Sequence, residues 1–178
     1  MAKQFTILEM NDILNLGKYF GLVVFVLLFH GFVVYGSFIT LAARLNPLMF
    51  FSKMKETALF AFSTSSSNAT IASNMATSTQ KLGVDNKVAS FTIPLGATIN
   101  MDGTAIMQGV ATVFISQVYG IDLTFSDYLL VVLTATLASI GTAGVPGVGL
   151  VMLAMVLQQV NLPVEGIALI IESIVCWI

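Results

Sequence analysis

A run of 23 residues, GLVVFVLLFHGFVVYGSFITLAA at positions 21–43, contains no Asp, Glu, Lys or Arg. A helix needs about 20 consecutive apolar residues to cross the hydrocarbon core of a bilayer. The whole chain shares this bias, with 57% hydrophobic and 9% charged residues, whereas about 25% of the residues in soluble domains are charged. Because the apolar runs are unbroken and lack the alternation of a membrane β-barrel, the sequence predicts an all-α integral membrane protein.

Five segments follow from the apolar pattern. We expect a transmembrane helix over 19–43, a helix pair around a serine-rich stretch over 47–83, an interrupted transmembrane helix over 85–120, a second helix pair over 124–160, and the start of a last helix over 166–178. The last segment ends after about 13 residues and is too short to cross a bilayer alone.

Charge predicts how the two helix pairs enter the membrane. Five of the seven basic residues flank the serine-rich stretch within 47–83 on both sides, which places both ends of this segment in the cytoplasm by the positive-inside rule. The links around 124–160 carry Asp122, Asp127 and Glu165 and no basic residue. We therefore expect two re-entrant hairpins that enter from opposite faces. The basic residues are Arg44, Lys53, Lys55, Lys81 and Lys87.

The stretch IPLGATINMDGTAIMQGVA, at 93–111, puts Asp102 inside an apolar segment. An ionisable residue within a membrane costs about 2.5 kcal/mol or more, and is therefore a functional candidate. The two expected hairpins, each followed by a helix and entering from opposite faces, form an inverted repeat. Inverted repeats with broken helices near the midplane are typical of secondary transporters. An unwound backbone and a carboxylate can replace the water shell of a small cation, and helix N-termini at the hairpin tips suit a substrate carboxylate.

Other function classes find little support. An intramembrane aspartyl protease needs two membrane carboxylates, and only Asp102 is well placed here. An intramembrane serine protease needs a Ser–His pair. His30 lies mid-span in the first helix with no second ionisable partner nearby, so we expect a packed or hydrogen-bonded helix contact there rather than a proton relay. The single Cys176 excludes a disulfide framework, and the absence of a basic stripe gives no indication of nucleic-acid binding.

Three motifs carry a resemblance to a known family: AFSTSSSNATI at 61–71, IPLGATINMDGTA at 93–105 and SIGTAGVPGVGLVML at 139–153. In order and spacing they resemble the sodium-coupled dicarboxylate/amino-acid:cation symporters, the glutamate-transporter family. The resemblance covers about 17–171 and corresponds to the sixth helix through the start of the eighth. It implies a portion of a transport domain that moves like an elevator against a homotrimeric scaffold, in a cell membrane such as the bacterial inner membrane.

The resemblance also implies site residues. One group contacts the substrate, either at the first hairpin tip, beside the substrate side chain, or in a gate at the second tip: Ser65, Ser66, Ser67, Thr104, Val145, Pro146, Gly147, Val148 and Gly149. The other group holds up to three sodium ions, the coupling ions: Gly96, Thr98, Asn100, Met101, Asp102, Ser139, Ile140 and Thr142. No other cofactor is implied, and the expected partners are lipid, sodium and an amino-acid or dicarboxylate substrate.

The chain departs from the family pattern at Ala72, where a Pro is usual, and at its end. GIALII is followed by ESIVCWI at 172–178, where the family continues G-[IV]-D-R-L-L-D-M. Deleting one base from codons for GIDRLLDM yields ESIVCWI and a stop, so we expect a frameshift. We also expect that the family's first five helices, and hence most of the scaffold, are absent. These expectations leave an inactive truncated product as the alternative to a working symporter.

Overall fold

The computed structural model describes residues 10–140 and 142–176, and these residues form helices and connecting turns without any strand. The first helical rod consists of α1 (Met10–Phe29), a π-helical turn η1 (His30–Tyr35) and α2 (Gly36–Leu41). Within this described part, Asn15–Leu41 is the one helix long and apolar enough to cross a membrane, and only 6% of its most apolar window is buried. The rod therefore offers most of its apolar surface to its surroundings.

The next two helices, α3 (Pro47–Thr64) and α4 (Ser67–Gln80), pack side by side. Asn46 caps α3 by accepting a hydrogen bond from the Leu48 amide at 2.9 Å, and the proline at the first helical position suits a helix start. The helix ends at Thr64, and the next residue, Ser65, turns the chain back with a φ of +47°. The Ser66 hydroxyl then caps α4 by accepting from the Ala69 amide.

A break in the chain direction separates α5 (Asn86–Ile99) from α6 (Asp102–Val118). Asn100 (φ −96°, ψ 74°) and Met101 (φ −107°, ψ 51°) leave the helical conformation. The α5 hydrogen bonds continue as far as the Asn100 amide, which donates to the Gly96 carbonyl at 2.8 Å. The interruption expected within 85–120 is therefore confined to two residues.

The last part of the chain contains α7 (Phe125–Ile140), α8 (Val148–Gln159), the 3-10 turn η2 (Val164–Gly166) and α9 (Ile167–Cys176). Thr124 and Asp127 cap the start of α7 reciprocally, each side chain accepting from the other's amide. The Thr124 hydroxyl, followed by its backbone amide, lowers the pKa of the Asp127 carboxyl. Gly147 precedes α8 with a φ of +84°, a conformation that L side chains rarely adopt.

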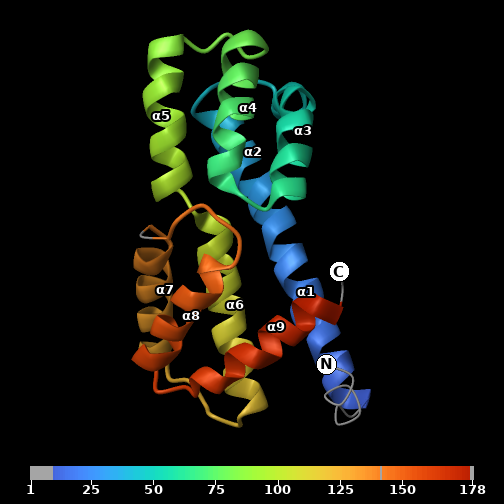
Figure 1. Ribbon diagram of the computed structural model, residues 1–178, viewed down its shortest axis with the longest axis vertical. Helices are drawn as coiled ribbons and strands as arrows, with labels where there is room; N and C mark the ends of the chain where they lie inside the picture. The colour runs from blue at the N-terminus through green and yellow to red at the C-terminus, as the bar shows by residue number, and fades with distance from the viewer. Residues whose placement is uncertain (1–9, 141, 177–178) are drawn as a thin grey trace.

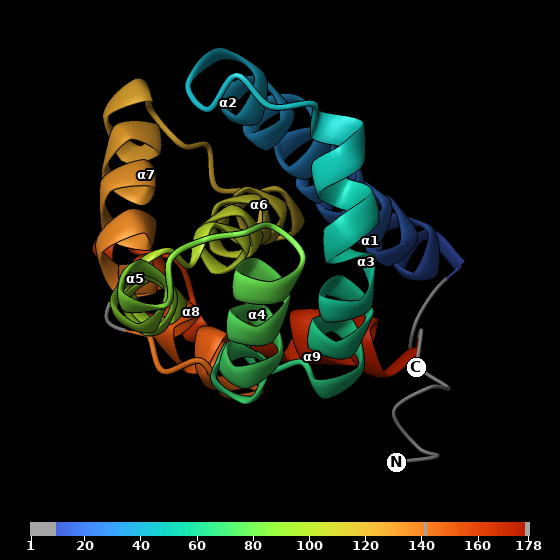
Figure 2. The same cartoon turned by 90° about the horizontal axis from the view of Figure 1, so that it is seen from above.

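The helices form two stacked groups (Figure 1). The segments α2–α5 occupy the upper half and α6–α9 the lower half, while α1 runs along one side. The α3–α4 connection, the α5–α6 break and the α7–α8 connection all lie at mid-height. Viewed from above, α6 lies between α1 and α7 (Figure 2), and it packs against both.

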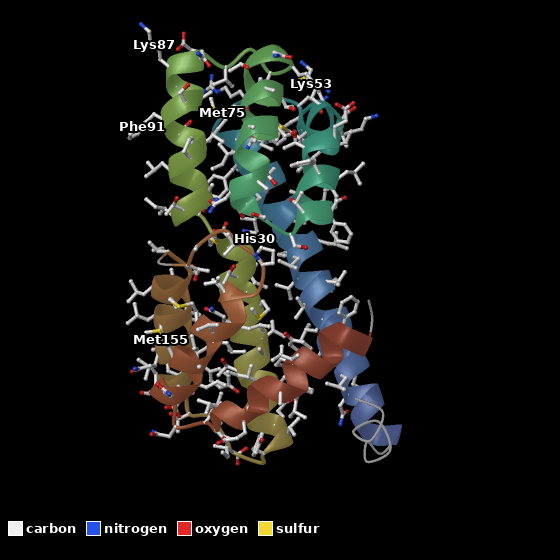
Figure 3. The ribbon with its side chains drawn as sticks, viewed as in Figure 1. His30, Lys53, Met75, Lys87, Phe91 and Met155 are labelled. Carbon is white, nitrogen blue, oxygen red and sulfur yellow. The ribbon has the colours of Figure 1, made fainter. Side chains whose placement is uncertain are left out.

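The apolar core belongs to the lower half. Its members come from α1, α6, α7, α8, α9 and the adjoining turns, and its fully buried members include Ile115, Leu153, Val156, Leu157 and Ile170. Basic residues gather at the opposite end, where Figure 3 shows Lys53 and Lys87 near the top of the molecule. The prediction of an all-α fold is confirmed for the residues that the structure describes.

Candidate functional site

The site begins at the α5–α6 break, where Asp102 is the first residue of α6. Its Oδ2 atom lies 3.0 Å from His30 Nε2 and accepts a hydrogen bond from the Tyr35 hydroxyl. Asn100, on the other side of Met101, donates from Nδ2 to the same hydroxyl at 3.0 Å. The carboxylate is one-third exposed, so it is hydrogen-bonded and still accessible.

His30 and Tyr35 are the first and last residues of the π-helical turn η1, and Figure 3 shows His30 at mid-height. The expectation of a hydrogen-bonded contact for His30 agrees with this geometry, but its partner is an ionisable residue 72 positions away. Sequence reasoning missed Tyr35. Both are polar residues in an apolar run, which is the only signal that the sequence offers for them.

The α3–α4 connection and the α7–α8 connection are in direct contact. The Gly144 carbonyl accepts a 2.8 Å hydrogen bond from the Ser66 hydroxyl and a 3.1 Å bond from the Asn68 amide. A Cβ atom at Gly144 would lie 3.0 Å from the Ser67 Cβ and 3.2 Å from the Asn68 nitrogen. A side chain at position 144 would therefore have to displace Ser67 or Asn68 by a few tenths of an ångström.

The first turn of α8 rests on α6. The Gly149 carbonyl accepts from Gln108 Nε2 at 3.1 Å, and a Cβ at Gly149 would lie 3.2 Å from Thr104 Cγ2. Gln108 is fully buried, and its Oε1 atom has no partner among the described residues. Sequence reasoning did not single out Gln108, although it is a polar residue six positions after Asp102 in an apolar helix.

The remaining predicted residues lie at the two connections and on or beside α5 and α7. Ser65 is exposed at the first connection, and Val145, Pro146, Gly147 and Val148 form the second connection and the start of α8. The hydroxyls of Thr98, Ser139 and Thr142 donate to carbonyls of α5 or α7, at 3.1, 2.8 and 2.7 Å. These hydroxyls lie on α5 and at the end of α7, two elements that pack together. Gly96 lies on α5, Met101 is buried, and the Ile140 side chain is exposed.

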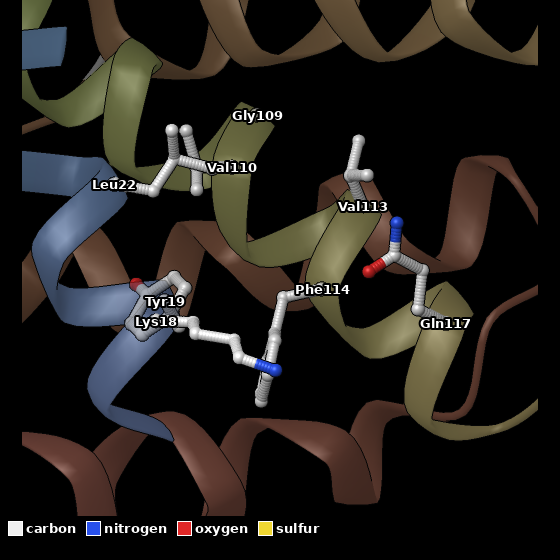
Figure 4. A pocket seen from close by; sticks show the side chains of 8 residues that line it. All are labelled: Lys18, Tyr19, Leu22, Gly109, Val110, Val113, Phe114 and Gln117. Carbon is white, nitrogen blue, oxygen red and sulfur yellow. The ribbon is translucent and has the colours of Figure 1, made fainter. Parts of the chain in front are cut away.

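A cavity of about 370 Å³ adjoins the first connection and the end of α5. Ser67, Asn74, Thr92, Gly96 and Asn100 are among its lining residues, so hydroxyl and amide groups face it. A second cavity, of about 310 Å³, lies between α1 and α6 beside Lys18, Tyr19 and Phe114 (Figure 4). Because the second cavity contains none of the predicted site residues, the polar cavity is the better candidate.

The chemistry of the site is that of oxygen ligands. The described residues contain no group of three or more His, Cys, Asp or Glu side chains that could hold a metal ion. Carbonyl, hydroxyl and amide oxygens and a single carboxylate are present instead. Such a set suits a small, hard cation of low charge better than a transition metal, which prefers nitrogen and sulfur ligands.

The chain matches a known protein family over almost its whole length. Residues 1–175 match the family model described as the sodium:dicarboxylate symporter family. The chain is 41% identical to excitatory amino acid transporter 1 of Rattus norvegicus over 169 residues, covering 93% of this chain and 31% of that protein. It is 40% identical to human excitatory amino acid transporter 5, with 93% and 30% covered, and 42% identical to mouse excitatory amino acid transporter 3, with 88% and 30% covered.

The chain thus spans about 30% of the length of these curated relatives. All three come from animals, so they give no support to the bacterial inner membrane expected from the sequence. A match over nearly the whole chain, to a family of transporters and not of enzymes, is sufficient to assign it. The chain belongs to the sodium:dicarboxylate symporter family of membrane transport proteins.

Proposed function

We propose that this chain forms the cation- and substrate-binding part of a symporter that couples sodium entry to uptake of an amino acid or dicarboxylate. The observation that carries the proposal is the meeting of three chain breaks at mid-height, beside the accessible carboxylate of Asp102. Broken helices at the midplane supply helix ends and free carbonyls to a bound ion and its substrate. Since the chain spans about 30% of its relatives, activity of the whole protein is part of the proposal.

Sodium would bind at the broken helix and the neighbouring end of α7. In this proposal, the carbonyls of Gly96 and Asn100 serve one ion, and Asn100 and Asp102 serve another. A third ion uses the remaining oxygen donors along α5, the break and α7. Those donors are Thr98, Met101, Ser139, Ile140 and Thr142. The packing of α5 against α7 supports this last group.

The substrate would bind between the two hairpin connections. Residues 65–67 precede or open α4, and residues 145–149 lead into α8, so both helix N-termini direct partial positive charge toward this region. A substrate carboxylate is stabilised by such helix ends. Thr104 would contact the side-chain end of the substrate, and the segment 145–149 would act as a gate. The Ser66–Gly144 contact supports this arrangement because it brings the two connections together.

The membrane arrangement is also part of the proposal. The α3–α4 and α7–α8 pairs would enter from opposite faces as re-entrant hairpins. Support comes from the basic end near Lys53 and Lys87 and from the location of both connections at mid-height. The pairs would belong to a transport domain that moves as an elevator against a trimeric scaffold in lipid.

Uptake into vesicles tests the function. The purified chain is reconstituted, and radiolabelled aspartate, glutamate and serine are offered with an inward sodium gradient or with choline. The proposal expects sodium-dependent uptake above empty vesicles. Sodium-dependent stabilisation of the protein without uptake would favour the alternative, a chain that retains the binding site but does not transport. The absence of both responses would overturn the proposal.

A further inference from the structure

A single hydroxyl group joins the two sides of the α5–α6 break. The Tyr35 hydroxyl donates to Asp102 Oδ2 and accepts from Asn100 Nδ2. These two partners flank Met101, and both belong to the sodium site proposed above. Tyr35 thus touches two proposed ligand residues without being among them.

The π-helical turn explains how Tyr35 and His30 reach the same carboxylate. In an α-helix, residues five apart point about 140° away from each other, because each residue rotates by about 100°. A π-helix pairs each residue with the one five positions on, which brings such residues close to one face. The two rings accordingly lie 4.9 Å apart in an edge arrangement, at 66°. Short π-helical turns are frequent at functional sites.

The His30 ring nitrogen and the Tyr35 hydroxyl contact the same oxygen of the Asp102 carboxylate. His30 Nε2 lies 3.0 Å from Asp102 Oδ2, the atom that also accepts from Tyr35, so a proton on Nε2 makes His30 the second donor. No described residue donates a hydrogen bond to Asp102 Oδ1 or to the Asn100 side-chain oxygen. Each proposed ligand residue therefore has one polar atom occupied by its neighbours and one oxygen left over.

We infer that Tyr35, supported by His30, is a positioning residue for cation binding. It fixes the Asn100 amide and the Asp102 carboxylate so that the free oxygen of each is available to the ion. Groups that hold metal ligands in place in this way typically contribute 10–100-fold to metal affinity. The inference rests on the proposed sodium site and adds to it the residues that set its geometry.

The test is a sodium titration of the purified full chain in detergent, with thermal stabilisation as the readout and choline replacing sodium. Tyr35→Phe keeps the ring and removes the hydroxyl. The expected result is a sodium midpoint raised about tenfold or more, and the unfolding temperature in choline measures separately how far the variant's stability changes without sodium. Tyr128→Phe is the matched control, since it removes the hydroxyl of an exposed tyrosine on α7, and its midpoint should equal that of the unaltered chain.

A second variant tests the same role independently, in case Tyr35→Phe does not fold. His30→Leu removes the other donor to Asp102 and should raise the midpoint by a smaller factor. If the unaltered chain is stabilised by sodium while both variants keep its midpoint, the positioning role is overturned and the sodium site stands. If sodium does not stabilise the unaltered chain, the sodium site and the positioning role fall together.

Discussion

The α3–α4 pair and the α7–α8 pair meet at their connections, but different interactions hold the helices of each pair in place. Between α3 and α4, the buried contact is a hydrogen bond of 2.8 Å between the Thr57 and Thr77 hydroxyls, with Ser73 at 3.4 Å. Around α7 and α8, the contact is apolar, formed by residues such as Val131, Leu153 and Leu157. Ala89 is the one buried apolar residue described in α3–α5.

The two kinds of contact stabilise helix packing by different physical effects. In lipid, apolar surface gains little from contact with other apolar surface, so hydroxyl bonds and close packing hold helices together. A well-packed apolar cluster still resists the loss of a side chain, because a cavity forfeits its contacts. We therefore expect the lower half to act as a rigid support and the α3–α4 pair to respond more weakly to single substitutions.

The largest effect is expected in the apolar half. Leu153→Ala removes a fully buried side chain and should lower the free energy of unfolding by about 2–5 kcal/mol. The measurement is unfolding by denaturant in detergent, followed by circular dichroism. Val151→Ala, on the same helix with the side chain 69% exposed, is the control and should change stability by about 0.5 kcal/mol or less. Equal losses from both variants would contradict a packed core here.

An intermediate effect is expected where the two pairs touch. Gly144→Ala places a Cβ 3.0 Å from the Ser67 Cβ, and overpacking of this kind costs about 1–3 kcal/mol. The Asn68 amide, which donates to Gly144, should exchange its hydrogen faster, as measured by mass spectrometry on peptides from the first connection. Gly109→Ala, with nothing within 4 Å of its added Cβ, should leave this exchange unchanged. Slow exchange in Gly144→Ala would show that the connections do not depend on this contact.

The smallest effect is expected in the hydroxyl-bonded pair. Thr57→Val and Thr77→Val each remove one partner of a buried hydrogen bond. A double-mutant cycle on unfolding should give a coupling energy of about 0.6 kcal/mol, the average for such bonds in membrane proteins. A coupling as large as the loss from Leu153→Ala would erase the difference between the two halves.

Much of the fold could be predicted because membrane burial leaves a strong pattern in the sequence. The length and apolarity of 21–43 favoured a helix, and the polar stretches near Ser66, Asp102 and Gly144 marked the places where helices end. The family could be recognised from three motifs at those same places. Whether the helix pairs re-enter the membrane stays a prediction, because it depends on surroundings that the chain alone does not supply.

The contacts of the site could not be predicted in the same way. His30 and Tyr35 lie about 70 residues from Asp102 in sequence. Their contact with Asp102 depends on how the rod packs against the broken helix, and on a π-helical turn that no local sequence pattern indicated. Gln108 could have been noticed as a polar residue in an apolar helix. Its bond to the Gly149 carbonyl follows only from tertiary packing. The sodium and substrate assignments stay predictions.

The central claim is that the α5–α6 break binds sodium through Asp102, and Asp102→Asn tests it directly. The change keeps the size of the side chain and removes its charge. In a thermal unfolding titration of the full chain with sodium against choline, the unaltered protein should be stabilised at increasing sodium, and Asp102→Asn should lose most of that stabilisation. Identical sodium dependence in the two proteins would contradict the claim.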